Sequence, residues 1–210
     1  MGNNSLLYFG TNEDLGQIVG ALDPNLGDRI LAVCGSGDQA FALVEHGPKV
    51  IAFDDNVAQI RYAKKRTEML KSEAHGFFST QSERTFTGNK AKDYLSERGR
   101  LERIRANLPN ISFLESDILS LDEDKVGQPN KIYMSNAIGH HYWGDRLEEL
   151  HLITSLLPVY GLLYTTNGDE VKAMMTCEQR LADQFELVQA LPPDDFNWNP
   201  MLFRKVGGSN

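Results

Sequence analysis

The chain has 210 residues, of which 41% are hydrophobic and 24% charged, as expected for a globular protein with a full-sized core. The net charge of −8 argues against a surface that binds nucleic acid along its whole extent. Two cysteines, Cys34 and Cys177, are too few for a disulfide framework, and no apolar run is long enough to span a bilayer. We therefore expect a cytoplasmic protein that has no integral membrane segment and does not bind nucleic acid.

Apolar strands alternate with amphipathic helices along the chain, which predicts a parallel sheet covered by helices on both faces. In chain order we expect a strand at Arg29–Val33, a helix at Gln39–Glu45, a strand at Val50–Phe53, a helix from Val57 to about Lys71, strands at Ile111–Leu114 and Lys131–Met134, a helix at Arg146–Leu157, a strand at Gly161–Thr165, a helix at Val171–Asp183, and strands at Phe185–Leu191 and Met201–Val206. The last two strands suit a hairpin. The predicted fold is α/β: a doubly wound, Rossmann-like, mostly parallel seven-stranded sheet with a C-terminal antiparallel hairpin and a helical insertion.

Residues 73–109 form the predicted insertion, since they exceed the short loops usual between such elements. Residues 91–108, AKDYLSERGRLERIRANL, read as one helix despite Gly99. The stretch from Arg84 to Arg105 has a net charge of +4, which leaves −12 on the remainder. Its arginines are typical of a solvated helix face. Alternatively, they could bind an acidic acceptor or an anionic membrane surface. We expect a single domain over residues 1–210.

A glycine turn, CGSGD at residues 34–38, joins the first strand to a helix. Gly35 and Gly37 let a ligand approach the backbone, and the helix start offers free N–H groups. Asp54 ends the second strand 17 residues after Gly37, close to the spacing of a carboxylate that binds a ribose diol. Asp117 follows the third strand, where a carboxylate can meet an adenine edge. Together these positions predict a nucleoside site.

Asp38 indicates which nucleoside is bound. It stands where a dinucleotide site normally has a third glycine, and its charge would repel a pyrophosphate. A cationic ligand suits this position better. S-adenosylmethionine has a sulfonium and an α-ammonium group, and we expect Asp38 to pair with the ammonium.

The chain resembles the class I S-adenosylmethionine-dependent methyltransferases. The resemblance covers nearly the whole chain outside residues 73–109, through the segments ILAVCGSGD, VIAFDDN, FLESDIL, KIYMSNAI and GLLYTTN and the closing hairpin. Within that superfamily the segment CGSGDQAFALVEHGPKVIAFDDNVAQ is similar to the betaine-lipid-synthase-type 3-amino-3-carboxypropyl transferases. Tyr8 with Glu13 and Asp14 also matches an N-terminal element of that group, although Asn12 replaces its usual tryptophan, and the chain is shorter than the lipid-making members.

The resemblance and the glycine turn together define the expected cofactor site. Its residues are Tyr8, Cys34, Gly35, Ser36, Gly37, Asp38, Asp54, Asp55, Asn56, Gln59, Asp117, Ile118, Ser135 and Asn136. We expect no metal, because the histidines show no ligand spacing with the cysteines.

The acceptor wall is expected in SNAIGHHYWGD, after the fourth strand. His140 or His141 suits a general base, and Tyr142 a wall of the acceptor site; helix capping or core packing are the alternatives. The resemblance implies transfer of the 3-amino-3-carboxypropyl group by attack at the γ-carbon of the cofactor. Methyl transfer to a small molecule and non-catalytic binding of the cofactor remain the alternatives. We expect a small-molecule or lipid-like acceptor and leave a homo-oligomer open.

Overall fold

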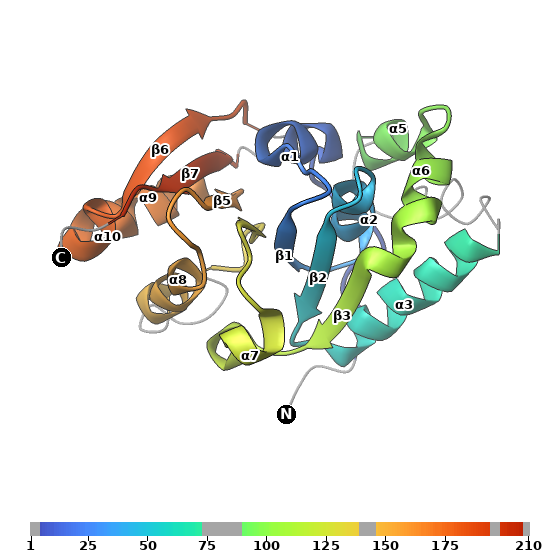
Figure 1. Cartoon of the computed structure of the whole chain (residues 1–210), viewed down its shortest axis with the longest axis horizontal. Coiled ribbons are helices and arrows are strands. Elements are labelled where there is room, and N and C mark those ends of the chain that lie inside the picture. The colour runs from blue at the N-terminus through green and yellow to red at the C-terminus, as the bar shows by residue number, and fades with distance from the viewer. Residues whose placement is uncertain (1–4, 73–89, 139–145, 194–197, 208–210) are drawn as a thin grey trace. The chain divides into compact units, whose positions relative to one another are not determined.

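The structure is a computed structural model that describes residues 5–72, 90–138, 146–193 and 198–207. Seven strands form one sheet in the order β3-β2-β1-β4-β5-β7-β6 (Figure 1). β2 pairs parallel with β3 and β4 pairs parallel with β5, whereas β7 runs antiparallel to both β5 and β6. The predicted fold is therefore confirmed: a mostly parallel, Rossmann-like sheet with helices on both sides and a closing antiparallel hairpin.

The chain divides into two compact units, Met1–Asp28 with Ala32–Asp117 and Arg29–Leu31 with Ile118–Asn210. They share β1 (Arg29–Val33). The first unit also contains α1 (Leu15–Leu22), α2 (Asp38–Val44), β2 (Lys49–Asp54), α3 (Val57–Lys71), α5 (Lys90–Ser96), α6 (Arg100–Asn107), η2 (Leu108–Asn110) and β3 (Ile111–Glu115).

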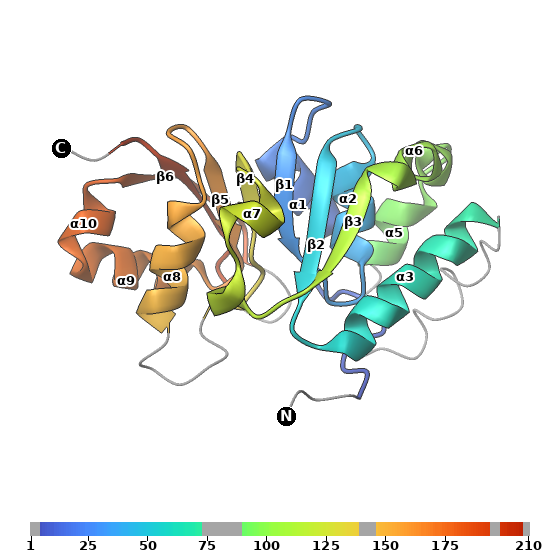
Figure 2. The ribbon, with the colours of Figure 1, turned by 60° about the horizontal axis from the view of Figure 1, so that its bottom comes forward.

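The core of the first unit lies around β1 and β2, whose apolar side chains are shielded from water. α2 and α3 pack against β2, and β1, β2 and β3 lie side by side in Figure 2. α3 begins after Asn56, whose side chain accepts a hydrogen bond from the backbone N–H of Ala58 at 2.9 Å. This cap fixes where α3 starts, immediately after the carboxyl end of β2.

The predicted long helix of the insertion is wrong in one respect. Gly99 has a φ of 80°, so the segment is two helices, α5 and α6, rather than one. The left-handed backbone at Gly99 breaks the helical hydrogen-bond pattern. Ile104 and Leu108 of this segment are buried and attach it to the core.

The second unit contains η3 (Ile118–Ser120), α7 (Glu123–Val126), β4 (Lys131–Tyr133), α8 (Arg146–Ser155), β5 (Leu162–Thr165), α9 (Gly168–Cys177), α10 (Gln179–Ala182), β6 (Phe185–Ala190) and β7 (Met201–Lys205). The helix predicted at Val171–Asp183 is also two helices, because Glu178 has an extended backbone between α9 and α10. Among the described residues, no helix combines the length and the apolar character needed to cross a membrane. The single-domain organisation stays a prediction.

Candidate cofactor site

The glycine turn is fixed by its backbone. The N–H of Cys34 donates to the carbonyl of Phe53 at 2.7 Å, and the N–H of Gly37 donates to the carbonyl of Cys34 at 2.7 Å. Gly35 and Gly37 have φ angles of 48° and 90°, which disfavour any side chain. A Cβ on Gly37 would lie 3.0 Å from the Cβ of Ala63, whereas one on Gly35 would meet no atom within 4 Å. The turn therefore packs tightly on α3 at Gly37 and leaves open space at Gly35.

Asp54 ends β2 beside this open space. Its Oδ2 accepts from the N–H of Gly35 at 2.9 Å, and its Oδ1 accepts from the N–H of Asn56 at 3.0 Å. Burial raises the pKa of Asp54 to about 6, although these two hydrogen bonds act in the opposite direction; the neighbouring charge of Asp55, itself exposed, raises it further. The carboxylate is thus held rigidly while both oxygens retain capacity to accept further hydrogen bonds.

Asp117 follows β3 at the same edge of the sheet. Asp54 is the register partner of Glu115, and the N–H of Ser116 donates to the carbonyl of Asp54 at 3.1 Å. Because β2 and β3 are parallel, their carboxyl ends meet at one edge. The first unit therefore brings the glycine turn, Asp54 and the segment containing Asp117 together.

Asp38 has protein partners that the sequence did not reveal. Its side chain is only 3% exposed and forms an ion pair with Arg66, whose Nη2 lies 2.6 Å from Oδ1. Its Oδ2 accepts from the N–H of Thr11 at 2.9 Å and from the hydroxyl of Ser36 at 2.8 Å. The carboxylate predicted to face an ammonium group is therefore paired with a buried guanidinium.

Arg66 was missed by sequence reasoning. Its Nη1 donates to the carbonyl of Ser36 at 2.7 Å, and its guanidinium lies 5.6 Å from the ring centroids of Phe41 and Tyr62. Arg66 follows Gln59 by seven residues, which places both on one face of α3. That spacing was the available signal, but a charged residue on a helix usually indicates a solvated face.

Gln59 connects the glycine turn to residues 5–11, which we call the N-terminal strap. Its Oε1 accepts from the N–H groups of Leu7 and Tyr8 at 2.7 and 2.9 Å. Its Nε2 donates to the carbonyls of Tyr8 and Gly35 at 3.0 and 2.8 Å. The amide, predicted to contact the cofactor, thus uses its donors and acceptors on the protein backbone.

Further contacts hold the strap in place. The amide of Asn56 donates to the carbonyl of Ser5 at 2.9 Å, and the hydroxyl of Tyr62 donates to the carbonyl of Phe9 at 3.1 Å. The side chains of Leu7, Tyr8 and Phe9 are nevertheless about half exposed. Asp14, which the resemblance marks, caps α1 by accepting from the N–H of Gln17 at 3.0 Å.

Three of the residues predicted for the cofactor site lie in the second unit. Ile118 is buried in η3, and Ser135 follows β4 with a φ of 53°, a left-handed backbone that a non-glycine residue seldom adopts. The carbonyl of Ser135 accepts from the N–H of Thr166 and the hydroxyl of Thr165, both at 2.8 Å. The hydroxyl of Ser135 lies 3.3 Å from the side-chain oxygen of Asn136, the third of these residues. His140, His141 and Tyr142 lie outside the described residues.

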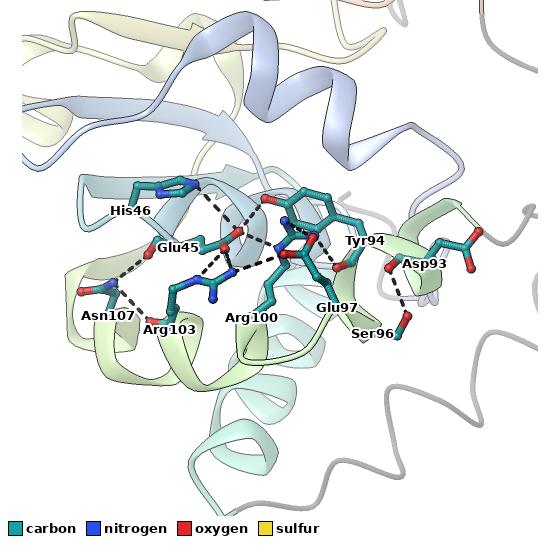
Figure 3. A network of polar contacts seen from close by, with 9 residues as sticks. All are labelled: Glu45, His46, Asp93, Tyr94, Ser96, Glu97, Arg100, Arg103 and Asn107. Atoms are coloured by element: carbon teal, nitrogen blue, oxygen red, sulfur yellow. Dashed lines mark hydrogen bonds and ion pairs between the residues drawn. The ribbon is translucent and has the colours of Figure 1, made fainter.

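The basic part of the insertion is tied to the protein by a buried carboxylate (Figure 3). Glu45, 3% exposed, accepts from the hydroxyl of Tyr94 at 2.7 Å and from Arg103 at 2.6 Å, and its Oε2 lies 3.0 Å from Nε of Arg100. Although burial opposes it, these donors hold the pKa of Glu45 below its usual value. Nε of Arg105 donates to the carbonyl of Leu70 at 3.0 Å. Three arginines of the predicted basic surface therefore bind the protein itself.

In the described part of the chain, no group of three or more histidine, cysteine, aspartate or glutamate side chains is arranged to hold a metal ion. Neither a family model nor a curated protein matches the sequence.

Solved structures match over most of the chain. The N-methyltransferase NodS from Bradyrhizobium japonicum WM9, in complex with S-adenosyl-L-homocysteine, has a TM-score of 0.57 and 12% identity, and the match covers 91% of this chain and 85% of that one. The chain has the Rossmann-like fold of these methyltransferases.

Two further structures share this fold. The magnesium protoporphyrin IX methyltransferase ChlM from Synechocystis PCC 6803, with bound S-adenosylmethionine, has a TM-score of 0.57 and 12% identity over 91% of this chain and 77% of that one. The [4+2]-cyclase SpnF has a TM-score of 0.60 and 10% identity over 92% and 80%. Their different reactions show that this fold does not by itself define a chemistry.

Proposed function

We propose that the chain is a transferase that uses S-adenosylmethionine. The observation that carries the proposal is the carboxylate of Asp54, which is held by the N–H of Gly35 beside the open space over that glycine. Structures of the same fold contain S-adenosylmethionine or its demethylated product, which supports this cofactor. The residues present fit the nucleoside part of such a molecule.

Each recognition group has a distinct proposed role. Asp54 accepts hydrogen bonds from the ribose hydroxyls, and Asp117 accepts from the exocyclic amine of the adenine. The backbone at Gly35 and Ser36 would bind the amino-acid portion of the cofactor. We do not assign the ammonium group to Asp38, because its carboxylate would have to give up Arg66.

The cofactor supplies a sulfonium that makes its attached carbons electrophilic. An acceptor nucleophile would form a bond to one of these carbons while the carbon–sulfur bond breaks, and the electron pair of the broken bond would remain on sulfur. His140 or His141 is the proposed base for the acceptor proton, and Tyr142 is a proposed part of the acceptor wall. Catalysis then consists of positioning and removal of this proton.

The group that moves is the second part of the proposal. The glycine-turn segment, with Gly37-Asp38 and Gly47-Pro48, resembles the betaine-lipid-synthase-type transferases, and this resemblance favours transfer of the 3-amino-3-carboxypropyl group. The names of the structural neighbours favour methyl transfer. The two reactions leave different nucleosides: 5′-methylthioadenosine in the first case and S-adenosylhomocysteine in the second.

Two measurements test the proposal. Calorimetric titration with S-adenosylmethionine should give saturable binding and raise the melting temperature; an absence of both effects would show that the proposed cofactor is wrong. Incubation with the cofactor and cell extracts should then yield one of the two nucleosides. S-adenosylhomocysteine alone would exclude aminocarboxypropyl transfer, and binding without either product would favour a non-catalytic module.

A further inference from the structure

A pocket of about 680 Å³ opens in the second unit and is not part of the cofactor site. Its walls come from α8, α10 and the end of β7. They include Glu148, His151, Leu152, Arg180, Leu181 and Lys205. The volume is within the range of about 300–1,000 Å³ that is usual for small-molecule sites.

The pocket lies at the end of β5 opposite to the one where transfer chemistry is expected. The N–H of Lys205 donates to the carbonyl of Gly161, directly before β5, whereas Thr165 at the other end of β5 pairs with Met201. In folds of this type, cofactor and acceptor meet at the carboxyl ends of the parallel strands. A ligand in this pocket would therefore be remote from the transferred group.

Two cations in the pocket have no carboxylate partner in the described part of the chain. The Nζ of Lys205 donates to the carbonyls of Thr154 and Leu157 at 3.0 and 2.7 Å, near the C-terminal end of α8, and an ammonium has three N–H donors. Arg180 is exposed and forms no ion pair among these residues. Burial lowers the pKa of Lys205, and the nearby charge of Arg180 lowers it further.

The remaining wall of the pocket is mixed. Leu152 and Leu181 provide apolar surface, and His151 is half-buried. Glu148 is the carboxylate in the lining, and no ion pair among the described residues joins it to either cation. An anion with an apolar body would satisfy the third donor of Lys205 and relieve its repulsion from Arg180.

We propose that this pocket binds an organic anion, with its carboxylate or phosphate on Arg180 and Lys205 and its apolar part against Leu152 and Leu181. Such a site is separate from the proposed cofactor site and does not depend on it. It gives the second unit a ligand of its own.

The test is an NMR titration of the full chain with phenyl phosphate, benzoate and inorganic phosphate. Saturable shifts at α8 and α10 are expected with phenyl phosphate or benzoate, and whichever binds more tightly identifies the head group. Binding of inorganic phosphate should be weaker, since it lacks the apolar part. Equal affinity for inorganic phosphate, or no saturable binding of either organic probe, would overturn the proposal.

Two variants locate the site. Arg180→Gln should weaken binding of the preferred probe about tenfold, as expected for the loss of a charge-assisted hydrogen bond. Arg204→Gln is the matched control, since Arg204 is exposed on β7 and pairs with Glu186 outside the pocket. Equal effects of the two variants, or none from Arg180→Gln, would contradict the assignment. Both side chains are exposed, so neither variant threatens folding.

Discussion

Burial disfavours the ionised form of Asp54, so this side chain titrates at a higher pH than an ordinary aspartate. Its pKa in the folded protein is about 6, above the usual 3.8. The folded state therefore holds the proton more tightly than the unfolded chain does. The contribution of Asp54 to the free energy of unfolding is full below about pH 4 and is lost as the pH rises through 6.

The affinity for S-adenosylmethionine should follow the opposite trend, because ribose hydroxyls need the ionised carboxylate as an acceptor. We expect the dissociation constant to increase as the pH falls below 6. Asp54→Ala should weaken binding by about 1–3 kcal/mol through the loss of charge-assisted hydrogen bonds. Calorimetry at several pH values checks both effects, with Glu68→Gln on the exposed face of α3 as the control. Unchanged affinity in Asp54→Ala would refute the ribose assignment.

The buried ion pair between Asp38 and Arg66 gives a second prediction about single residues. Asp38→Asn leaves a buried guanidinium without its counter-charge, so we expect a loss of about 3–5 kcal/mol in the free energy of unfolding without cofactor. Urea denaturation measures this loss, and Arg66→Met in the same chain should restore part of it. Unaltered stability of Asp38→Asn, combined with weaker cofactor binding, would instead support the ammonium role predicted from the sequence.

At the scale of elements, the N-terminal strap depends on one side chain of α3. Gln59→Ala removes four hydrogen bonds to the backbone of Leu7, Tyr8 and Gly35. We expect faster amide hydrogen exchange at Leu7 and Tyr8 and a loss of about 1–3 kcal/mol in stability. Glu68→Gln again serves as the control. Protection of the strap in Gln59→Ala would mean that other contacts hold it.

The insertion helices α5 and α6 depend in the same way on Glu45, which lies at the C-terminal end of α2. Glu45→Gln removes the charge that faces Arg100 and Arg103, and we expect a loss of about 3 kcal/mol in stability. Because the folded-state pKa of Glu45 is lowered, its contribution is present at neutral pH and is lost as the pH falls below its usual 4.5. Glu97→Gln is the matched control: its side chain is 57% exposed, so it should cost less than about 1 kcal/mol.

A result in which Glu97→Gln and Glu45→Gln destabilise equally in thermal or urea unfolding would contradict this account. The comparison separates a buried carboxylate that holds the insertion from a surface charge in the same network.

At the scale of the whole molecule, the single-domain expectation predicts one cooperative unfolding transition. Both tryptophans, Trp143 and Trp198, belong to the second unit by sequence, so tryptophan fluorescence follows that unit alone. Far-UV circular dichroism follows the helices of both units. Coincident urea transitions by the two probes are expected for one domain. Separate midpoints would show that the two units unfold independently.

The local pattern of the sequence was sufficient for much of the fold. The strands were predictable because runs such as Ile30–Ala32 are apolar on both faces, and the glycine turn because Gly35 and Gly37 fall between a strand and a helix. We predicted that Gly99 lies inside a continuous helix, because the sequence does not reveal the positive φ angle that this glycine adopts. The same limit applies to the extended backbone at Glu178.

The candidate site was predictable in part. A parallel sheet brings strand ends to one edge, so Asp54 and the segment of Asp117 were expected to be neighbours. The partners of buried polar groups could not be predicted from the order of the strands. Arg66 is 28 residues from its partner Asp38, and Arg103 is 58 residues from its partner Glu45. No local sequence pattern specifies that these charges form ion pairs.

By itself, the sequence determined the succession of the seven strands along the chain, most of the helices between them, and the positions of the glycine turn and strand-end carboxylates. These features depend on periodicity and backbone preference, which act over a few residues. Only the tertiary structure decided that Asp38 pairs with Arg66, that Gln59 holds the N-terminal strap, and that the insertion arginines bind Glu45. Buried charges and amides must find partners when water is removed, and those partners are chosen by packing between distant segments.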